Sequence, residues 1–129
     1  MRVIRSVSFA ELSPSQIASW ARCQEADKSL ESPYFHPEFT QCVAAVRGDV
    51  EVAVVHQNGE SVGFFPFQRR GRHAARPVGG RLSDYQGMIG QRGLSWNVKE
   101  VLLACDLTSW SFDHVLACQT PWSQYHRVT

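Results

Sequence analysis

A short polar loop contains the strongest candidate for a binding site in this sequence. Residues 83–87 read Ser-Asp-Tyr-Gln-Gly, which places a carboxylate (Asp84), a phenol (Tyr85) and a carboxamide (Gln86) at consecutive positions. These groups can orient an amine or a hydroxyl and can hydrogen-bond a sugar-like or peptide-like acceptor. Binding residues concentrate in loops on rigid scaffolds. The alternative interpretation is structural, with Asp84 stabilising a turn and Tyr85 packing against the core.

Two basic stretches that contain glycine are candidates for a phosphate-binding loop. Residues 68–73 (QRRGRH) begin like the Q/R-x-x-G-x-G/A pattern that binds the pyrophosphate of coenzyme A, and residues 76–81 read RPVGGR. Such a loop needs small residues, because consecutive backbone amides must approach the phosphate closely. His73 and Arg81 occupy the last position of the two stretches. We therefore interpret them as a basic hairpin turn and a glycine bend.

The histidines and cysteines show no pattern typical of a metal site or an activated nucleophile. The five histidines have no H-x-x-x-H or H-x-H spacing, and the four cysteines include no C-x-x-C pair, so no metal site is predicted. We expect free and mostly buried thiols. Asp113 and His114 are neighbours on a predicted strand and point to opposite faces. His36 precedes Pro37 and is interpreted as a hydrogen-bonding residue at a helix start, with substrate binding as the alternative.

Composition and charge limit the classes of protein to which the chain can belong. Its 129 residues include 13 Lys and Arg against 12 Asp and Glu, with 43% hydrophobic and 19% charged residues. This balance excludes an intrinsically disordered chain and one that holds nucleic acid or anionic lipid by bulk charge. No apolar run approaches the roughly 18 residues of a membrane span. We expect a cytoplasmic protein with neither nucleic acid nor membrane as partner.

Hydrophobic periodicity predicts the elements that must position these residues. Strands are expected over residues 2–9, 50–56, 61–68, 74–78 and 110–116, and helices over 14–28, 37–47 and from a cap at Ser95. Asn58-Gly59 favours a hairpin turn, because this pair readily adopts positive φ. Pro66 lacks an amide, so a bulge or an unpaired position is expected there. After Cys118 the pattern dissolves, which divides the chain into a domain over 1–118 and an irregular tail over 119–129.

The order of these elements is strand, two helices, a meander of strands, helix and strand. It predicts a mixed α/β (α+β) fold in three layers, with an antiparallel hairpin at the centre of the sheet. The stretch 62–67 (VGFFPF) is apolar at nearly every position, which indicates a strand buried on both faces.

Several motifs in the same order resemble one family. They are SPYFHPEFT at 32–40, VGFFPF at 62–67, PVGGRLSDYQG at 77–87 and WSFDH at 110–114. Together they resemble the GNAT-superfamily acyltransferases of the cellulose-biosynthesis type, often called CelD-like, over nearly the whole chain. The resemblance implies a GNAT-like three-layer fold and transfer of an acyl group from acyl-CoA to an amine or hydroxyl of an acceptor. It also implies a link to exopolysaccharide or cellulose biosynthesis.

The resemblance covers only the amino-terminal, acceptor-side half of such a protein. Members of this family have two GNAT-like halves, and the acetyl-CoA signature belongs to the second. The resemblance therefore implies that this chain alone binds no cofactor, although acetyl-CoA or another acyl-CoA serves the family. The implied partners are a small-molecule, saccharide or peptide acceptor and either a second GNAT half or a second copy of the chain. In this picture the loop at 83–87 borders the cleft between the halves.

Two expectations follow from the division into halves. The first is an exposed apolar face that favours self-association, with Trp110, Phe112, Trp122 and Tyr125 as its candidate residues. The second is that the missing phosphate loop removes independent catalysis, so a non-catalytic GNAT-like module that binds a substrate or a partner is the alternative function.

Overall fold

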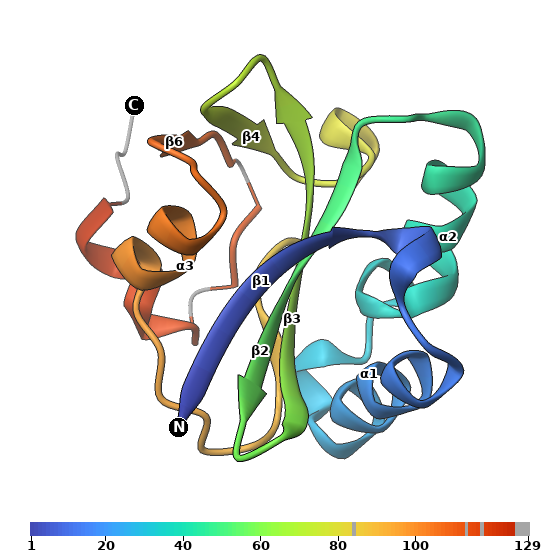
Figure 1. Ribbon diagram of the computed structural model, residues 1–129, viewed down its shortest axis with the longest axis vertical. Helices are drawn as coiled ribbons and strands as arrows, with labels where there is room; N and C mark the ends of the chain where they lie inside the picture. The colour runs from blue at the N-terminus through green and yellow to red at the C-terminus, as the bar shows by residue number, and fades with distance from the viewer. Residues whose placement is uncertain (84, 113, 117, 126–129) are drawn as a thin grey trace.

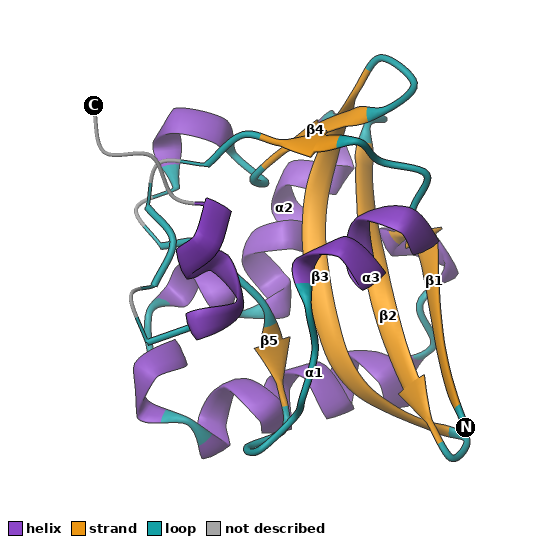
Figure 2. Cartoon of the chain, turned by 90° about the vertical axis from the view of Figure 1, so that its left-hand side faces the viewer, coloured by secondary structure: helices purple, strands orange, loops and turns teal. Residues whose placement is uncertain are grey.

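A mixed β-sheet lies at the centre of the molecule, between two layers of helices (Figure 1). The structure is a computed structural model that describes residues 1–83, 85–112, 114–116 and 118–125. Asp84 and Asp113 lie outside the described residues. Figure 2 shows helices α1 and α2 on one side of the sheet and α3 on the other. The predicted mixed α+β class is therefore confirmed.

The sheet has six strands among the described residues. They are β1 (Arg2–Ser8), β2 (Val50–Gln57), β3 (Glu60–Arg70), β4 (Ala74–Arg76), β5 (Ile89–Gly90) and β6 (Ser109–Trp110). Strands β1 to β4 pair antiparallel in sequence order, β5 pairs with β3, and β6 pairs with β4 in parallel. This parallel pair makes the sheet mixed.

The central hairpin forms as predicted. Asn58 and Gly59 have φ values of 54° and 83°, the left-handed conformation that this turn requires. The register of β2 and β3 shifts between Val55 and His56, and not at Pro66, which pairs opposite Val52. On its other edge Pro66 has no named strand beside it, because β4 pairs with β3 at Gln68–Arg70 and β5 at Gly63–Phe64. The expected bulge is therefore not at Pro66, which stays in register with Val52 and lacks a named strand only on its other edge.

The helices begin at residues that cap them. In α1 (Pro14–Ala26), the Ser13 side chain accepts a hydrogen bond from the Gln16 amide, and Pro14 occupies the first position, where no amide is needed. Helix α2 (Pro37–Val46) begins in the same way after His36. Helix α3 (Val98–Ala104) begins later than expected, because Asn97 and not Ser95 accepts from the Glu100 amide. None of the described helices has the length and apolar character of a membrane span.

The two faces of β3 belong to two hydrophobic cores. Phe64 faces α1, where it stacks on Trp20 with ring centroids 5.3 Å apart. Phe65 and Phe67 face the opposite core, together with Trp110 and Trp122. The stretch 62–67 is thus buried on both sides of the sheet, as its composition indicates.

The expected exposed apolar face is corrected for Trp110 and Trp122. Residues Thr120–Tyr125 form a 3₁₀ helix, which carries Trp122 onto the sheet at 4.4 Å from the ring centroid of Trp110. Only 2% of Trp122 and 8% of Trp110 remain exposed. Phe112 is half-buried against both rings, and the side chain of Tyr125 lies outside the described residues. Self-association therefore stays a prediction, but Trp110 and Trp122 are no longer candidates for the exposed face that would drive it.

The predicted strand at 110–116 is largely wrong. Among the described residues of this segment, only Ser109–Trp110 joins the sheet as a strand, and an isolated bridge between Val115 and Gln86 follows. The expectation of mostly buried thiols is correct for Cys23 and Cys105, whereas Cys42 and Cys118 are exposed.

Candidate functional site

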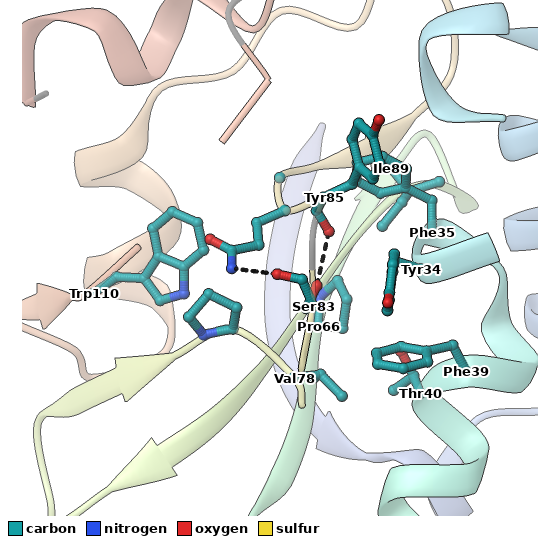
Figure 3. A pocket seen from close by; sticks show the side chains of 13 residues that line it. Tyr34, Phe35, Phe39, Thr40, Pro66, Val78, Ser83, Tyr85, Ile89 and Trp110 are labelled. Carbon is teal, nitrogen blue, oxygen red and sulfur yellow. Dashed lines mark hydrogen bonds between the residues drawn. The ribbon is translucent and has the colours of Figure 1, made fainter. Parts of the chain in front are cut away.

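A narrow pocket lies between α2, the loop before β5 and the end of β6 (Figure 3). Its cavity volume is about 20 Å³, which is close to the space that one water molecule needs. Its walls are mostly aromatic side chains and prolines. The lining residues are Tyr34, Phe35, Phe39, Thr40, Pro66, Pro77, Val78, Ser83, Tyr85, Gln86, Gly87, Ile89 and Trp110.

The pocket sits where the sheet is interrupted. Strands β4 and β6 pair only from Ala74 to Ala75, and the next parallel contact along the chain is the Gln86–Val115 bridge. Between these two points residues 77–83 leave the sheet through a turn and the 3₁₀ helix Gly80–Leu82. Pro66, which has no strand partner on this side, forms part of the wall. The pocket therefore occupies the space left where the pairing between the strands is interrupted.

Gly79 lets α2 approach this loop closely. A Cβ atom at Gly79 would lie 2.8 Å from Cζ of Phe39, and its φ of 82° is one that side chains disfavour. Phe39 in turn packs edge-on against Tyr34, with ring centroids 4.9 Å apart. Any larger residue at position 79 would push the aromatic wall outward.

Gln86, a predicted binding residue, lines the pocket and also holds the loop in place. Its side-chain oxygen accepts from the His114 amide at 3.1 Å, and its side-chain nitrogen donates to the Ser83 carbonyl oxygen at 3.2 Å. Its backbone amide and carbonyl bond to His114 and Leu116. Only 4% of the residue is exposed. Gln86 thus joins the loop at 83–87 to residues 114–116.

Tyr85 and His36, the other predicted binding residues within the described part, lie in different places. Tyr85 is at the rim of the pocket, 47% exposed, with its ring centroid 6.3 Å from that of Phe35. His36 is not among the lining residues. Its Nδ1 accepts from the Glu38 amide at 3.1 Å and caps α2, so its interpretation as a helix-start residue is confirmed. Asp84 lies outside the described residues, and its role stays a prediction.

Two polar side-chain atoms of the lining residues have no hydrogen-bond partner among the described residues. They are Oγ1 of Thr40 and Nε1 of Trp110, and both atoms are buried. A buried polar group without a partner costs about 1–3 kcal/mol, and such groups are rare in native proteins. The sequence did not single out either residue as a binding residue, because Thr40 lies within a predicted helix and Trp110 at the start of a predicted strand.

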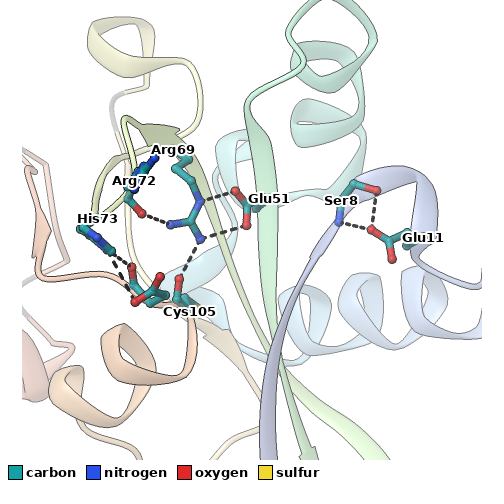
Figure 4. Close-up of polar contacts among 8 residues, drawn as sticks. Ser8, Glu11, Glu51, Arg69, Arg72, His73 and Cys105 are labelled. Atoms are coloured by element: carbon teal, nitrogen blue, oxygen red, sulfur yellow. Dashed lines mark hydrogen bonds and ion pairs between the residues drawn. The ribbon is translucent and has the colours of Figure 1, made fainter.

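The basic stretch at 68–73 is a hairpin turn, as interpreted from the sequence. Gly71 has a φ of 68° between β3 and β4. The guanidinium of Arg69 donates to Oε1 of Glu51 at 3.1 Å, to the Cys105 carbonyl oxygen at 2.7 Å and to the Arg72 carbonyl oxygen at 2.9 Å (Figure 4). The positive charge of Arg69 is thus balanced by the carboxylate of Glu51. Gly79 and Gly80 both have positive φ, which confirms the glycine bend.

Residues far apart in the chain meet at the pocket, and all of them except Ile89 belong to the four motifs. Tyr34, Phe35, Phe39 and Thr40 come from the first motif, Pro66 from the second and Trp110 from the fourth, while the third supplies Pro77, Val78, Ser83, Tyr85, Gln86 and Gly87. The part of the chain that the structure describes contains no cluster of His, Cys, Asp and Glu able to hold a metal ion. Comparison of the chain with protein-family models, with curated proteins and with solved structures finds no match in any of the three.

Proposed function

We propose that this chain is the acceptor-side half of a GNAT-like acyltransferase and that the pocket binds the acceptor. The convergence of the four motifs on one pocket is the observation that carries the proposal. The order of elements, with β1, α1 and α2 before the strands β2 to β4 and with α3 before a parallel β6, supports a GNAT-like arrangement.

The pocket serves to hold and orient the acceptor. Acyl transfer requires a deprotonated attacking group and a polarised thioester carbonyl. In the pocket wall, the Ser83 hydroxyl already donates to the Tyr85 carbonyl oxygen at 3.0 Å, and the polar atoms of Gln86 bond to the main chain. The aromatic walls narrow the space open to a bound group and so fix its geometry, which lowers the entropic barrier to reaction. The acyl-CoA, in this proposal, is held by the second half.

Two structural features support the assignment of coenzyme A to another part of the protein. The cation of Arg69 is engaged by Glu51. The amino-terminal amides of α1 and α2 that a phosphate would approach first are capped by Ser13 and His36. Calorimetry of this chain with acetyl-CoA should therefore give a dissociation constant weaker than about 1 mM. A micromolar value would overturn the assignment to the acceptor-side half.

The catalytic part of the proposal is tested on the product of the whole reading frame that contains this sequence. We expect acceptor-dependent release of the coenzyme A thiol from acetyl-CoA, with kcat/KM lowered about tenfold or more by Tyr34→Ala, which removes part of the pocket wall. Leu103→Ala, at a side chain 69% exposed on α3, is the matched control. If no acceptor gives thiol release, the alternative function, a non-catalytic binding module, is favoured. The ion pair of Arg69 with Glu51 and the capped amides of α1 and α2 are also consistent with that alternative.

A further inference from the structure

The hairpin of β3 and β4, with the bend that follows it, concentrates positive charge in a nearly neutral chain. Residues 68–81 contain five arginines and no aspartate or glutamate, whereas the whole chain has a formal net charge of +1. Figure 1 shows this hairpin at one end of the sheet, away from α1. Arg69 is balanced by Glu51. The other arginine side chains that the structure describes here, Arg70, Arg72 and Arg76, form no ion pair with a described residue.

Two of these arginines lie on the same face of the hairpin. In the antiparallel register of β3 and β4, Arg76 pairs opposite Gln68, and Arg70 pairs opposite Ala74. Cross-strand partners share a face, and so do alternate residues of one strand, which makes Arg70 and Arg76 diagonal neighbours. Diagonal positions are about 7–8 Å apart, a distance that long side chains can bridge. The two guanidinium groups can therefore approach one ligand together.

The guanidinium group of Arg76 has a buried edge and an accessible one. Its Nε atom is buried without a hydrogen-bond partner among the described residues, whereas the residue as a whole is only partly buried. Nη1 lies against the bend, 3.6 Å from where a Cβ atom of Gly80 would be. Because residue 80 has no side chain, it leaves this end of the guanidinium group uncovered. The accessible donors of Arg76 are thus its two Nη atoms, which form the fork that an oxyanion accepts.

The acidic group beside this face is already balanced by another arginine. Gln68 donates to Oδ1 of Asp49 at 3.0 Å and accepts from the Gly79 amide at 2.8 Å. The carboxylate of Asp49 in turn pairs with Nη2 of Arg47 at 2.8 Å. Asp49 therefore does not offset the charge of the two arginines on the hairpin.

We propose that Arg70 and Arg76 together bind the phosphate group of a phosphorylated small molecule. A phosphate monoester carries a charge of about −1.5 to −2 near neutral pH and so balances two guanidinium groups, whereas a carboxylate balances one. The site takes a single phosphate and is not a loop of amides for a pyrophosphate, because the amides of Gly79 and Gly80 already donate within the fold. The proposal goes beyond the proposed function, since it uses neither the pocket nor acyl transfer.

Titration of the nitrogen-15-labelled chain with inorganic phosphate at constant ionic strength tests the site. The buried Nε–H group of Arg76 is sheltered from water, so its NMR signal reports on the site, and Arg76→Lys assigns it. We expect inorganic phosphate and methyl phosphate to shift this signal saturably, with dissociation constants in the millimolar range. Acetate, which carries one negative charge, should bind about threefold more weakly or worse.

Substitutions separate a specific site from general attraction to positive charge. Arg76→Gln and Arg70→Gln should each weaken phosphate binding about fivefold or more, because each removes charge-assisted hydrogen bonds. Arg76→Lys keeps the charge but loses the fork, so binding should weaken by about threefold. The backbone amide signal of Gly80 reports on binding in the Arg76 variants. Arg92→Gln, at an exposed arginine in the loop between β5 and α3, is the matched control and should bind as the parent does.

Three results would overturn the inference. They are the absence of a saturable shift with phosphate, equal weakening by Arg92→Gln and Arg76→Gln, and binding of parental strength by Arg70→Gln. Arg70 is exposed, so its variant should fold even if replacement of the partly buried Arg76 destabilises the chain. Neither acyl-CoA nor an acceptor enters these measurements, so their outcome is separate from that of the proposed function.

Discussion

The indole nitrogen of Trp20 donates a hydrogen bond to the carbonyl oxygen of Phe35, 2.8 Å away. Trp20 is completely buried and Phe35 is 1% exposed. Because Trp20 also stacks on Phe64 of β3, this contact fixes the segment Pro33–Phe35 relative to both α1 and the sheet. The aromatic wall of the pocket is thus anchored in the hydrophobic core.

Trp20→Phe should test this anchor. The substitution keeps an aromatic ring but leaves the Phe35 carbonyl without its donor, which we expect to lower the free energy of unfolding by about 1–3 kcal/mol. Urea denaturation followed by circular dichroism measures the effect. Trp96→Phe, at a half-buried ring, is the comparison and should cost less. Equal midpoints for Trp20→Phe and the parent protein would show that the anchor contributes nothing.

Phe64→Ala tests the central hairpin. The Phe64 side chain is completely buried on the face of the sheet that packs against α1, so its removal should cost about 3–5 kcal/mol of unfolding free energy. The denaturant midpoint should fall without a change of slope. Leu103→Ala, on the exposed face of α3, should change stability by no more than about 0.5 kcal/mol. A Phe64→Ala protein as stable as the control would contradict the burial of this strand.

The cysteines should separate into two reactive and two inert thiols. Burial raises the pKa of the Cys105 thiol to about 12, and burial also raises the pKa of Cys23. Since the thiolate is the reacting form, neither should react with an aromatic disulfide reagent at mildly alkaline pH. Cys42 and Cys118 are exposed and should react. We therefore expect two thiols to titrate in the native protein and four in denaturant, and rapid native reaction of all four would refute the assignment.

Local signals in the sequence were sufficient to predict the hairpin and the first two helices. Asn58-Gly59 specifies its turn through backbone conformation, and Ser13-Pro14 and His36-Pro37 specify helix starts through capping and a fixed φ. These effects act over a few residues, so a single sequence reveals them. The 3₁₀ helix Thr120–Tyr125 has no such signal. Trp122 is buried because it packs into the core formed by the sheet and α3. This burial depends on tertiary contacts and leaves no local signal in the sequence.

The candidate site was predictable only in part, for the same reason. Tyr85 and Gln86 stand out because polar residues in a glycine-bounded loop have no periodic explanation. Thr40 and Trp110 read as ordinary helix and strand residues, and only the folded chain brings them to one pocket. A missing hydrogen-bond partner is a property of the surroundings of an atom, so no spacing in the sequence can show it.

Neighbouring residues of the loop at 83–87 should respond differently to mutation. Gln86→Ala removes the bonds to the His114 amide and the Ser83 carbonyl oxygen, which we expect to lower the free energy of unfolding by about 1–3 kcal/mol. Tyr85→Ala removes a side chain that is 47% exposed at the rim and should cost no more than about 1 kcal/mol. Thermal and urea unfolding of the two variants measure this contrast.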